Sequence, residues 1–150
     1  MDAPLYNADI LRLAASIPHG ERLRQAEGTA DRTSPVCGSR VTVDVVLDRQ
    51  GRIADLGQEV RACALGQASA SILGRHALGE TAESLGDAHA QLKQWLKGEG
   101  ALPTPLAARF PELALFEAAR AHPGRHPSIL LAFEATAAAA LMAGQLARQA

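Results

Sequence analysis

The stretch SRVTVDVVLDRQGRIADLGQEVRAC, residues 39–63, decides the fold because it predicts two antiparallel strands joined by a tight turn. Residues 39–47 alternate between apolar and polar side chains, which is the period of a strand with one face in the core. The turn DRQG at 48–51 follows, and residues 52–63 return as a second strand that is irregular near Gly57. The positions of the first strand expected to face the core are Val41, Val43, Val45 and Leu47.

Helical patterns lie on both sides of this strand pair. Predicted N-caps are Asn7 for the first helix, Asp87 for the third and Ser128 for the last. The polar segment before the strand pair holds at most one further short strand, around residues 22–27. Residues 98–111, rich in proline and glycine, predict an extended, linker-like segment. The predicted helices cover residues 8–17, 64–78, 86–97, 112–121 and 128–149.

These elements predict one α+β domain over residues 1–150, a small antiparallel sheet of about three strands with helices packed on one face. The net charge of −1 and the aromatic content of 3% argue against nucleic-acid or membrane-surface binding. No run reaches the roughly 18 apolar residues of a membrane span, and the first residues lack a signal-peptide pattern. We therefore expect a cytoplasmic protein with neither nucleic-acid nor membrane partners.

The sequence does not predict an enzyme. It contains no GxSxG element, no GxGxxG element and no Walker loop. No nucleophile, general base and oxyanion donor are expected at one common location.

The two cysteines are the residues that point to chemistry. Cys63 lies where the second strand ends and a helix of small residues begins, and helix N–H groups at such a position favour a thiolate. Cys37, in the turn SPVCGS, precedes the first strand, so both thiols are expected at the same end of the sheet. There they could converge and bind a soft metal or an iron–sulfur cluster. Among the histidines, His126 is the further candidate, because it is expected in the loop before the last helix. The alternative is that each thiol is a small buried hydrophobic group.

Four segments carry a family resemblance: LYNADILRLA (5–14), SPVCGSRVTVDVVLD (34–48), GQEVRACALGQASASIL (57–73) and GRHPSILLAFEA (124–135). In order and spacing they resemble the IscU/SufU/NifU N-terminal family of iron–sulfur cluster assembly scaffold proteins. The similarity covers about residues 5–142, and the additional segment near 98–124 is closer to the SufU branch. The resemblance implies a SufE/IscU-like α+β fold.

The resemblance also implies a site that holds zinc or a nascent cluster through three cysteines and one aspartate. Cys37 and Cys63 match the first two of these cysteines. Ser39 stands at the aspartate position and Ser128 at the third cysteine position. Both are expected to be non-ligating, because a serine hydroxyl is a poor metal ligand at neutral pH. A histidine found beside the third cysteine in some members corresponds to His126 after a shift of one residue.

Two functions follow from the resemblance. The first is a scaffold or carrier protein that binds iron, an iron–sulfur cluster or zinc through Cys37 and Cys63, helped by His126 or by a second subunit of a homodimer. The second is a degenerate family member that no longer binds a cluster and acts as a sulfur acceptor or docking partner of a cysteine desulfurase. The residues alone leave a third reading, a structural domain with inert thiols. The partners implied are a cysteine desulfurase and cluster-recipient proteins.

Overall fold

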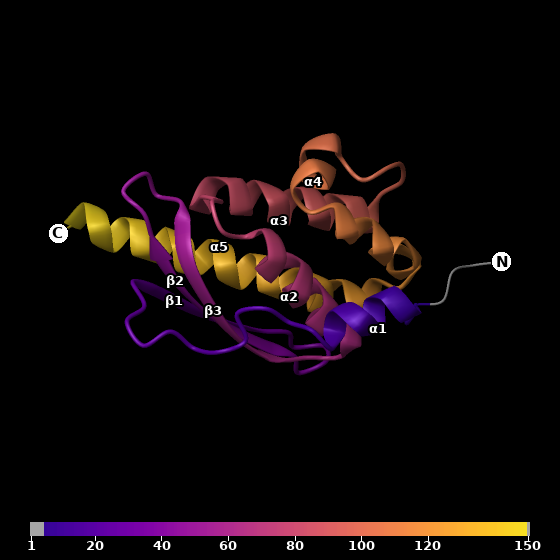
Figure 1. The fold of residues 1–150 in the computed structure, drawn as a ribbon. Coiled ribbons are helices and arrows are strands. Elements are labelled where there is room, and N and C mark those ends of the chain that lie inside the picture. The colour runs from indigo at the N-terminus through magenta and orange to yellow at the C-terminus, as the bar shows by residue number, and fades with distance from the viewer. Residues whose placement is uncertain (1–4, 150) are drawn as a thin grey trace.

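Three antiparallel strands form the sheet of the protein (Figure 1). The computed structural model describes residues 5–149, and within them the strand order is β1-β2-β3. The predicted strand pair is confirmed, with Arg40 opposite Arg61 at one end. The strands are β1 Gly28–Thr33, β2 Arg40–Leu47 and β3 Ile53–Arg61.

The outer face of the sheet corrects two predictions. The strand expected around residues 22–27 is wrong, because Arg22 and the backbone N–H of Leu23 instead bind the Asp44 carboxylate on that face, at 2.6–3.0 Å. The irregularity expected near Gly57 is also wrong, since Gly57 pairs regularly with Asp44 and the register shifts between β2 and β3 nearer the turn. Asp44, expected on a polar face, has a side chain that is only 1% exposed.

The helices occur in the predicted order, with some different boundaries. Asn7 caps the first helix as predicted, accepting a hydrogen bond from the backbone of Ile10. The third helix begins earlier than predicted and contains Asp87, because Thr81 and Ser84 form a capping box ahead of it. The α-helices are α1 Ala8–Ala14, α2 Ala64–His76, α3 Ala82–Lys97, α4 Thr104–Arg109 and α5 His126–Gln149. Two 3-10 helices lie at Pro111–Ala121 and Pro123–Arg125. The first of these occupies the place of the helix predicted over residues 112–121.

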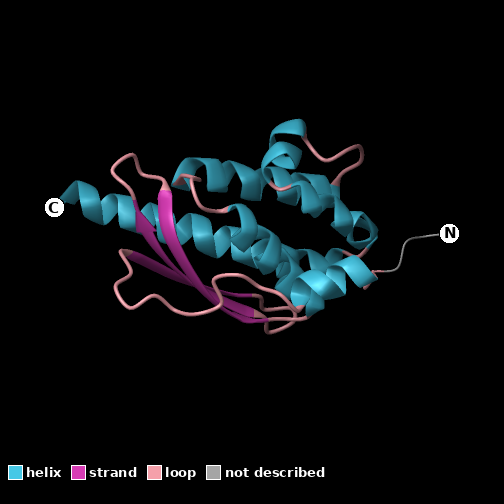
Figure 2. Ribbon diagram, viewed as in Figure 1, coloured by secondary structure: helices cyan, strands magenta, loops and turns pink. Residues whose placement is uncertain are grey.

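Helix α5 is the central helix of the core. It lies between the sheet and α3, and α2 lies beside it, so the helices cover one face of the sheet as predicted (Figures 1 and 2). It begins at His126, and Ser128 lies inside its first turn instead of capping it. Gly28 of β1 allows close packing, because a Cβ there would overlap the Ala139 carbonyl oxygen and lie 2.8 Å from the Ala143 nitrogen.

The segment predicted as a linker, residues 98–111, contains α4 and is anchored by Arg120 from the 3-10 helix that follows. The Arg120 guanidinium lies over the Trp95 ring, 4.7 Å from its centroid. Its nitrogens donate to the carbonyl oxygens of Trp95, Gly98 and Gly100 at 2.9, 2.6 and 2.8 Å. The segment is therefore held against the end of α3.

The segment Pro123–Gln149 is long and apolar enough to cross a membrane, judged by length and composition only. More than half of its most apolar window is buried inside the protein. The central helix of a folded core meets the same criterion, so the place of α5 between sheet and α3 accounts for its apolar character.

We expect Gly28→Ala to destabilise the protein by about 2 kcal/mol or more, because the added methyl group forces α5 away from β1. Gly86→Ala is the matched control, since Gly86 lies in α3 with nothing within 4 Å of an added Cβ. That change should stabilise the protein by about 1 kcal/mol through helix propensity. Denaturant unfolding measures both free energies, and a stable Gly28→Ala variant would contradict the close approach.

Candidate functional site

Cys37 lies in the turn that joins β1 to β2, residues 34–39. Two backbone hydrogen bonds close this turn, from Ser34 N–H to Ser39 O at 2.8 Å and from Gly38 N–H to Ser34 O at 2.9 Å. Gly38 has a φ of 72°, a conformation that side chains disfavour and glycine accepts. The turn holds Cys37 in an exposed position.

The sulfur of Cys37 contacts two buried hydroxyl groups. Its Sγ lies 3.0 Å from Ser39 Oγ and 2.9 Å from Ser128 Oγ. Both serines are almost fully buried, at 3% and 2% exposure, and Ser128 comes from the first turn of α5. When Cys37 is ionised, both hydroxyls donate to the sulfur, because a thiolate only accepts. The site is an exposed cysteine whose sulfur contacts buried hydroxyl donors.

These hydrogen bonds determine the ionisation of Cys37. Burial raises the pKa of the thiol, but hydrogen bonds from Ser128 and then Ser39, together with the effect of the Ser34 hydroxyl, outweigh burial and lower the pKa from 9.0 to about 6. At neutral pH the side chain is therefore mainly a thiolate, which is the nucleophilic and metal-binding form.

Ser34 is a site residue that the sequence analysis missed. It is 1% exposed, and its hydroxyl makes no hydrogen bond of ordinary geometry with any group of residues 5–149. Its effect on the pKa of Cys37 nevertheless places it near the sulfur. The signal in the sequence was the pair of serines that bracket Cys37 in SPVCGS, since a closed turn brings both toward the central side chain.

Cys63 lies at the same end of the sheet, as expected from the strand pairing. It is the N-cap residue of α2 and follows Arg61, which pairs with Arg40 at the start of β2. Its side chain is half-buried, makes no capping hydrogen bond and packs against the hydrophobic core. The first turn of α2 meets that of α5, since a Cβ on Gly66 would lie 3.3 Å from the Ser128 carbonyl oxygen. The two cysteines are free thiols.

His126 is buried and bound to the 3-10 helix before it. Its Nε2 lies 3.0 Å from the Ala119 carbonyl oxygen and carries the hydrogen, because a carbonyl oxygen only accepts. This contact fastens the start of α5 to the preceding segment. A role of His126 as a metal ligand stays a prediction.

One chain does not bring together a full set of metal ligands. Across residues 5–149, no three side chains of His, Cys, Asp or Glu form a group that could hold a metal ion. The positions that the family resemblance assigns to ligands supply two thiols and two hydroxyls, from Cys37, Cys63, Ser39 and Ser128. Zinc and iron–sulfur clusters need thiolate, imidazole or carboxylate ligands, so this donor set alone does not fit them.

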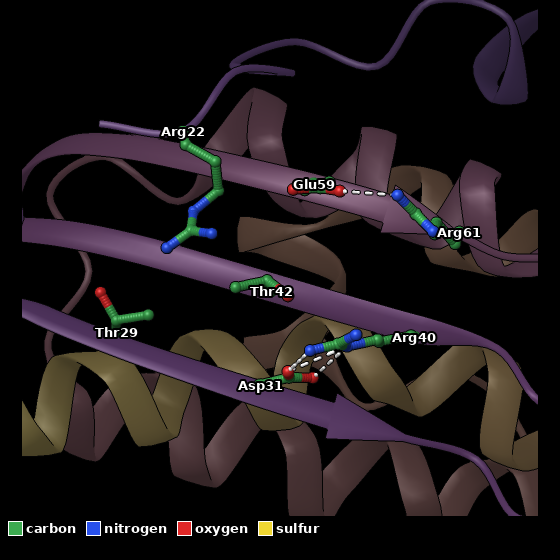
Figure 3. Close-up of a pocket in the computed structure, with 7 residues that line it drawn as sticks. All are labelled: Arg22, Thr29, Asp31, Arg40, Thr42, Glu59 and Arg61. Carbon is green, nitrogen blue, oxygen red and sulfur yellow. Dashed lines mark hydrogen bonds and ion pairs between the residues drawn. The ribbon is translucent and has the colours of Figure 1, made fainter. Parts of the chain in front are cut away.

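A polar hollow of about 360 Å³ lies on the outer face of the sheet (Figure 3). Thr29 and Thr42 contribute hydroxyl groups to it. Each of its arginines is paired with a carboxylate: Arg22 with Asp44, Arg40 with Asp31, and Arg61 with Glu59. Because these charges neutralise one another, the hollow offers no unpaired cation to an anionic ligand, and Cys37 remains the candidate site.

A comparison with known protein families identifies the family of this chain. The model of the NifU-like N-terminal domain matches residues 6–104, well over half of the chain. The protein belongs to the NifU-like N-terminal domain family. This membership confirms the resemblance found in the sequence.

Solved structures agree with this assignment. The N-terminal part of a nitrogen-fixing NifU-like protein from Brucella abortus is 35% identical, with a TM-score of 0.86 over 94% of this chain and 95% of that one. The fold is shared by a putative iron–sulfur cluster assembly scaffold protein for the SUF system from Fervidobacterium islandicum AW-1. The identity is 18% and the TM-score 0.73, over 91% of this chain and 96% of that one. A hypothetical protein shares the fold at 21% identity, with a TM-score of 0.76 over 89% of this chain and 95% of that one. A search of curated proteins gave no significant match.

The NifU-like fold thus brings three of the predicted positions into direct contact. Cys37, Ser39 and Ser128 lie within hydrogen-bonding distance in the places that the resemblance gives to a cysteine, an aspartate and a cysteine. Cys63 stands at the same end, at the start of α2. Two of the positions to which the resemblance assigns ligands thus carry serine in contact with Cys37.

We expect alkylation of Cys37 by iodoacetamide to titrate with a midpoint at about pH 6, measured in a Cys63→Ser chain so that Cys37 is the sole thiol. Ser128→Ala removes the strongest of the stabilising hydrogen bonds, so the midpoint should rise by about one pH unit or more. Ser16→Ala, an exposed serine after α1, is the control and should leave the midpoint unchanged. A midpoint at the ordinary cysteine value in the Cys63→Ser chain would contradict the assignment.

Proposed function

We propose that this NifU-like protein serves iron–sulfur cluster assembly as a sulfur carrier, accepting sulfur from a cysteine desulfurase on Cys37. The observation that carries the proposal is that Cys37 is an exposed residue whose sulfur lies 3.0 and 2.9 Å from the buried hydroxyls of Ser39 and Ser128. Such donors stabilise a negative charge on sulfur without occupying its open side.

The transfer is a thiol–persulfide exchange. The Cys37 thiolate attacks the outer sulfur of a persulfide on the desulfurase and forms a new S–S bond. The S–S bond between that outer sulfur and the desulfurase cysteine breaks, and the cysteine leaves with the electron pair as a thiolate. The outer sulfur keeps its own proton or charge, so no oxidant or reductant is consumed.

The chain's own groups contribute at two stages of this exchange. Before transfer, Ser39 and Ser128 keep Cys37 ionised at neutral pH, which supplies the attacking form. After transfer, the same hydroxyls can donate to the inner sulfur, while the terminal sulfur extends toward solvent from an exposed residue. That orientation suits delivery to a partner protein.

Binding of a cluster, iron or zinc is the second candidate function, favoured by the position of Cys37 and Cys63 at one end of the sheet. In that function the metal or cluster is the cargo of the protein. One chain supplies two thiols, whereas a cluster with cysteine ligands takes four. A second chain or a recipient protein would have to contribute the others. Sulfur acceptance requires Cys37 alone, and for this reason we place it first.

Incubation with a cysteine desulfurase and free cysteine should add one sulfur atom to the protein, detected by intact-mass spectrometry and peptide mapping. We expect the adduct on Cys37, since its thiolate is the stabilised one. Cys37→Ser should abolish it and Cys63→Ser should retain it. An adduct found only on Cys63 would overturn the assignment of the acceptor.

Combining Ser39→Asp with Ser128→Cys restores a carboxylate and a thiolate at the two replaced positions. We expect the double variant to bind zinc about tenfold or more tightly than the unaltered chain, because both new groups are anionic ligands next to Cys37. Competition with a chromophoric chelator measures the affinity.

The control adds Cys37→Ser to that double variant and should lose the gain. Ser39→Asn with Ser128→Ala, which adds no anionic ligand, should bind no more zinc than the unaltered chain. Equal zinc affinity of the double variant and the unaltered chain would contradict a shared site.

A further inference from the structure

Three large apolar side chains are exposed near the C-terminal end of α5, far from Cys37. Leu141 is 51% exposed, Met142 43% and Leu146 53%. Figure 1 shows this end of the helix, in yellow, running out past the strands to the C-terminus. Leu141 is the one of these three that lies between exposed charged residues on a common face, because helical geometry places Met142 about 100° and Leu146 about 140° around the helix from it.

The exposed face of α5 has a regular arrangement around Leu141. Glu134 and Arg148 lie seven residues before and after it, and helical geometry puts residues at this spacing on one face. Both are exposed. The residues between them on this face include Ala138 and Gly144, which are small. The face therefore has a leucine at its centre, small residues on both sides and opposite charges at its two ends.

This arrangement is complementary to itself when the helix is reversed. In an antiparallel pair related by a two-fold axis at Leu141, Glu134 of each chain lies opposite Arg148 of the other. Ala138 of each chain lies opposite Gly144 of the other, which permits a close approach of the helices. A parallel pair would place like charges together. An interface of this kind uses the same patch on both subunits, as two-fold dimers do.

We propose that a second copy of this chain docks on this face, forming a dimer of antiparallel α5 helices centred on Leu141. The two Glu134–Arg148 pairs determine the antiparallel direction, and the two copies of Leu141 supply the apolar contact at the axis. Opposite helix dipoles favour the same direction.

The surroundings of the face leave room for a partner helix. A groove of about 400 Å³ runs beside Leu141 and Gly144, between α5, the β2–β3 turn and the start of α3. Glu134 lies 3.5 Å from Arg32 of its own chain and is still 46% exposed, so its carboxylate can accept a second guanidinium. The charge that the partner requires is thus present and accessible.

The dimer keeps the two sulfur sites apart. Ser128 lies thirteen residues before Leu141 on α5, which at 1.5 Å per residue is about 20 Å from the axis. The two Cys37 sites then lie on opposite sides of the axis, about 40 Å from each other. Each chain therefore presents its own Cys37 to a partner, and this dimer cannot join its two sites in one cluster.

Sedimentation equilibrium of the full chain tests the proposal. One helix pair covers less than the roughly 800 Å² per partner of a standard interface, so we expect a reversible dimer with a dissociation constant of about 10 μM. The mass should rise from 15.7 kDa toward twice that value as concentration increases. A monomer mass up to about 500 μM, fifty times that constant, would overturn the proposal.

Variants identify the surface and the direction. Leu141→Glu places two carboxylates at the axis and should weaken association at least tenfold, while Leu78→Glu, at a site with a similar exposure of 49%, should not. Glu134→Arg and Arg148→Glu should each weaken it, and the two together should restore it. If Glu134→Arg weakened association only because it removes the contact with Arg32 of the same chain, the double variant would remain weakened. Unchanged association of Leu141→Glu, or no restoration by the double change, would overturn the antiparallel α5 pair.

Discussion

The close packing of α5 on the sheet is the constraint on which the site depends. Ser128 reaches the Cys37 sulfur only because the first turn of α5 lies directly against the turn between β1 and β2. Two glycines permit the close packing of α5: Gly28 makes room on β1 for the helix near Ala139 and Ala143, and Gly66 makes room on α2 for its first turn near Ser128. The hydroxyl that most strongly stabilises the thiolate is thus held by a rigid central helix and not by a surface loop.

Serines stand at positions 39 and 128, where the family resemblance implies a metal-ligating aspartate and cysteine, and they determine what this geometry can do. Serine hydroxyls instead donate hydrogen bonds, which stabilise the negative charge and leave the sulfur available as a nucleophile. The buried Ser34 hydroxyl, without a partner of ordinary geometry among residues 5–149, acts in the same direction. The site therefore has the chemistry of a stabilised thiolate.

Much of this was predictable where the sequence pattern reflects a single physical cause. The alternation of valines predicted β2, and antiparallel pairing with β3 predicted that both cysteines lie at one end of the sheet. The strand β1 was missed because its sequence, GTADRT, has small or polar residues and an apolar alternation too weak to recognise. Ser128 was assigned to a cap because the sequence cannot show that α5 begins two residues earlier, where His126 binds Ala119. The contact of Ser128 with Cys37 spans 91 positions and follows only from tertiary packing.

The stacking of Arg120 on Trp95 gives the protein an internal optical reporter. Trp95 is the single tryptophan of the chain, and it is 4% exposed beneath the guanidinium. Its fluorescence therefore comes from one known place, where the segment between α3 and α5 is fastened. Release of that segment would admit water to the indole and shift its emission to longer wavelength, without any label attached near the thiols.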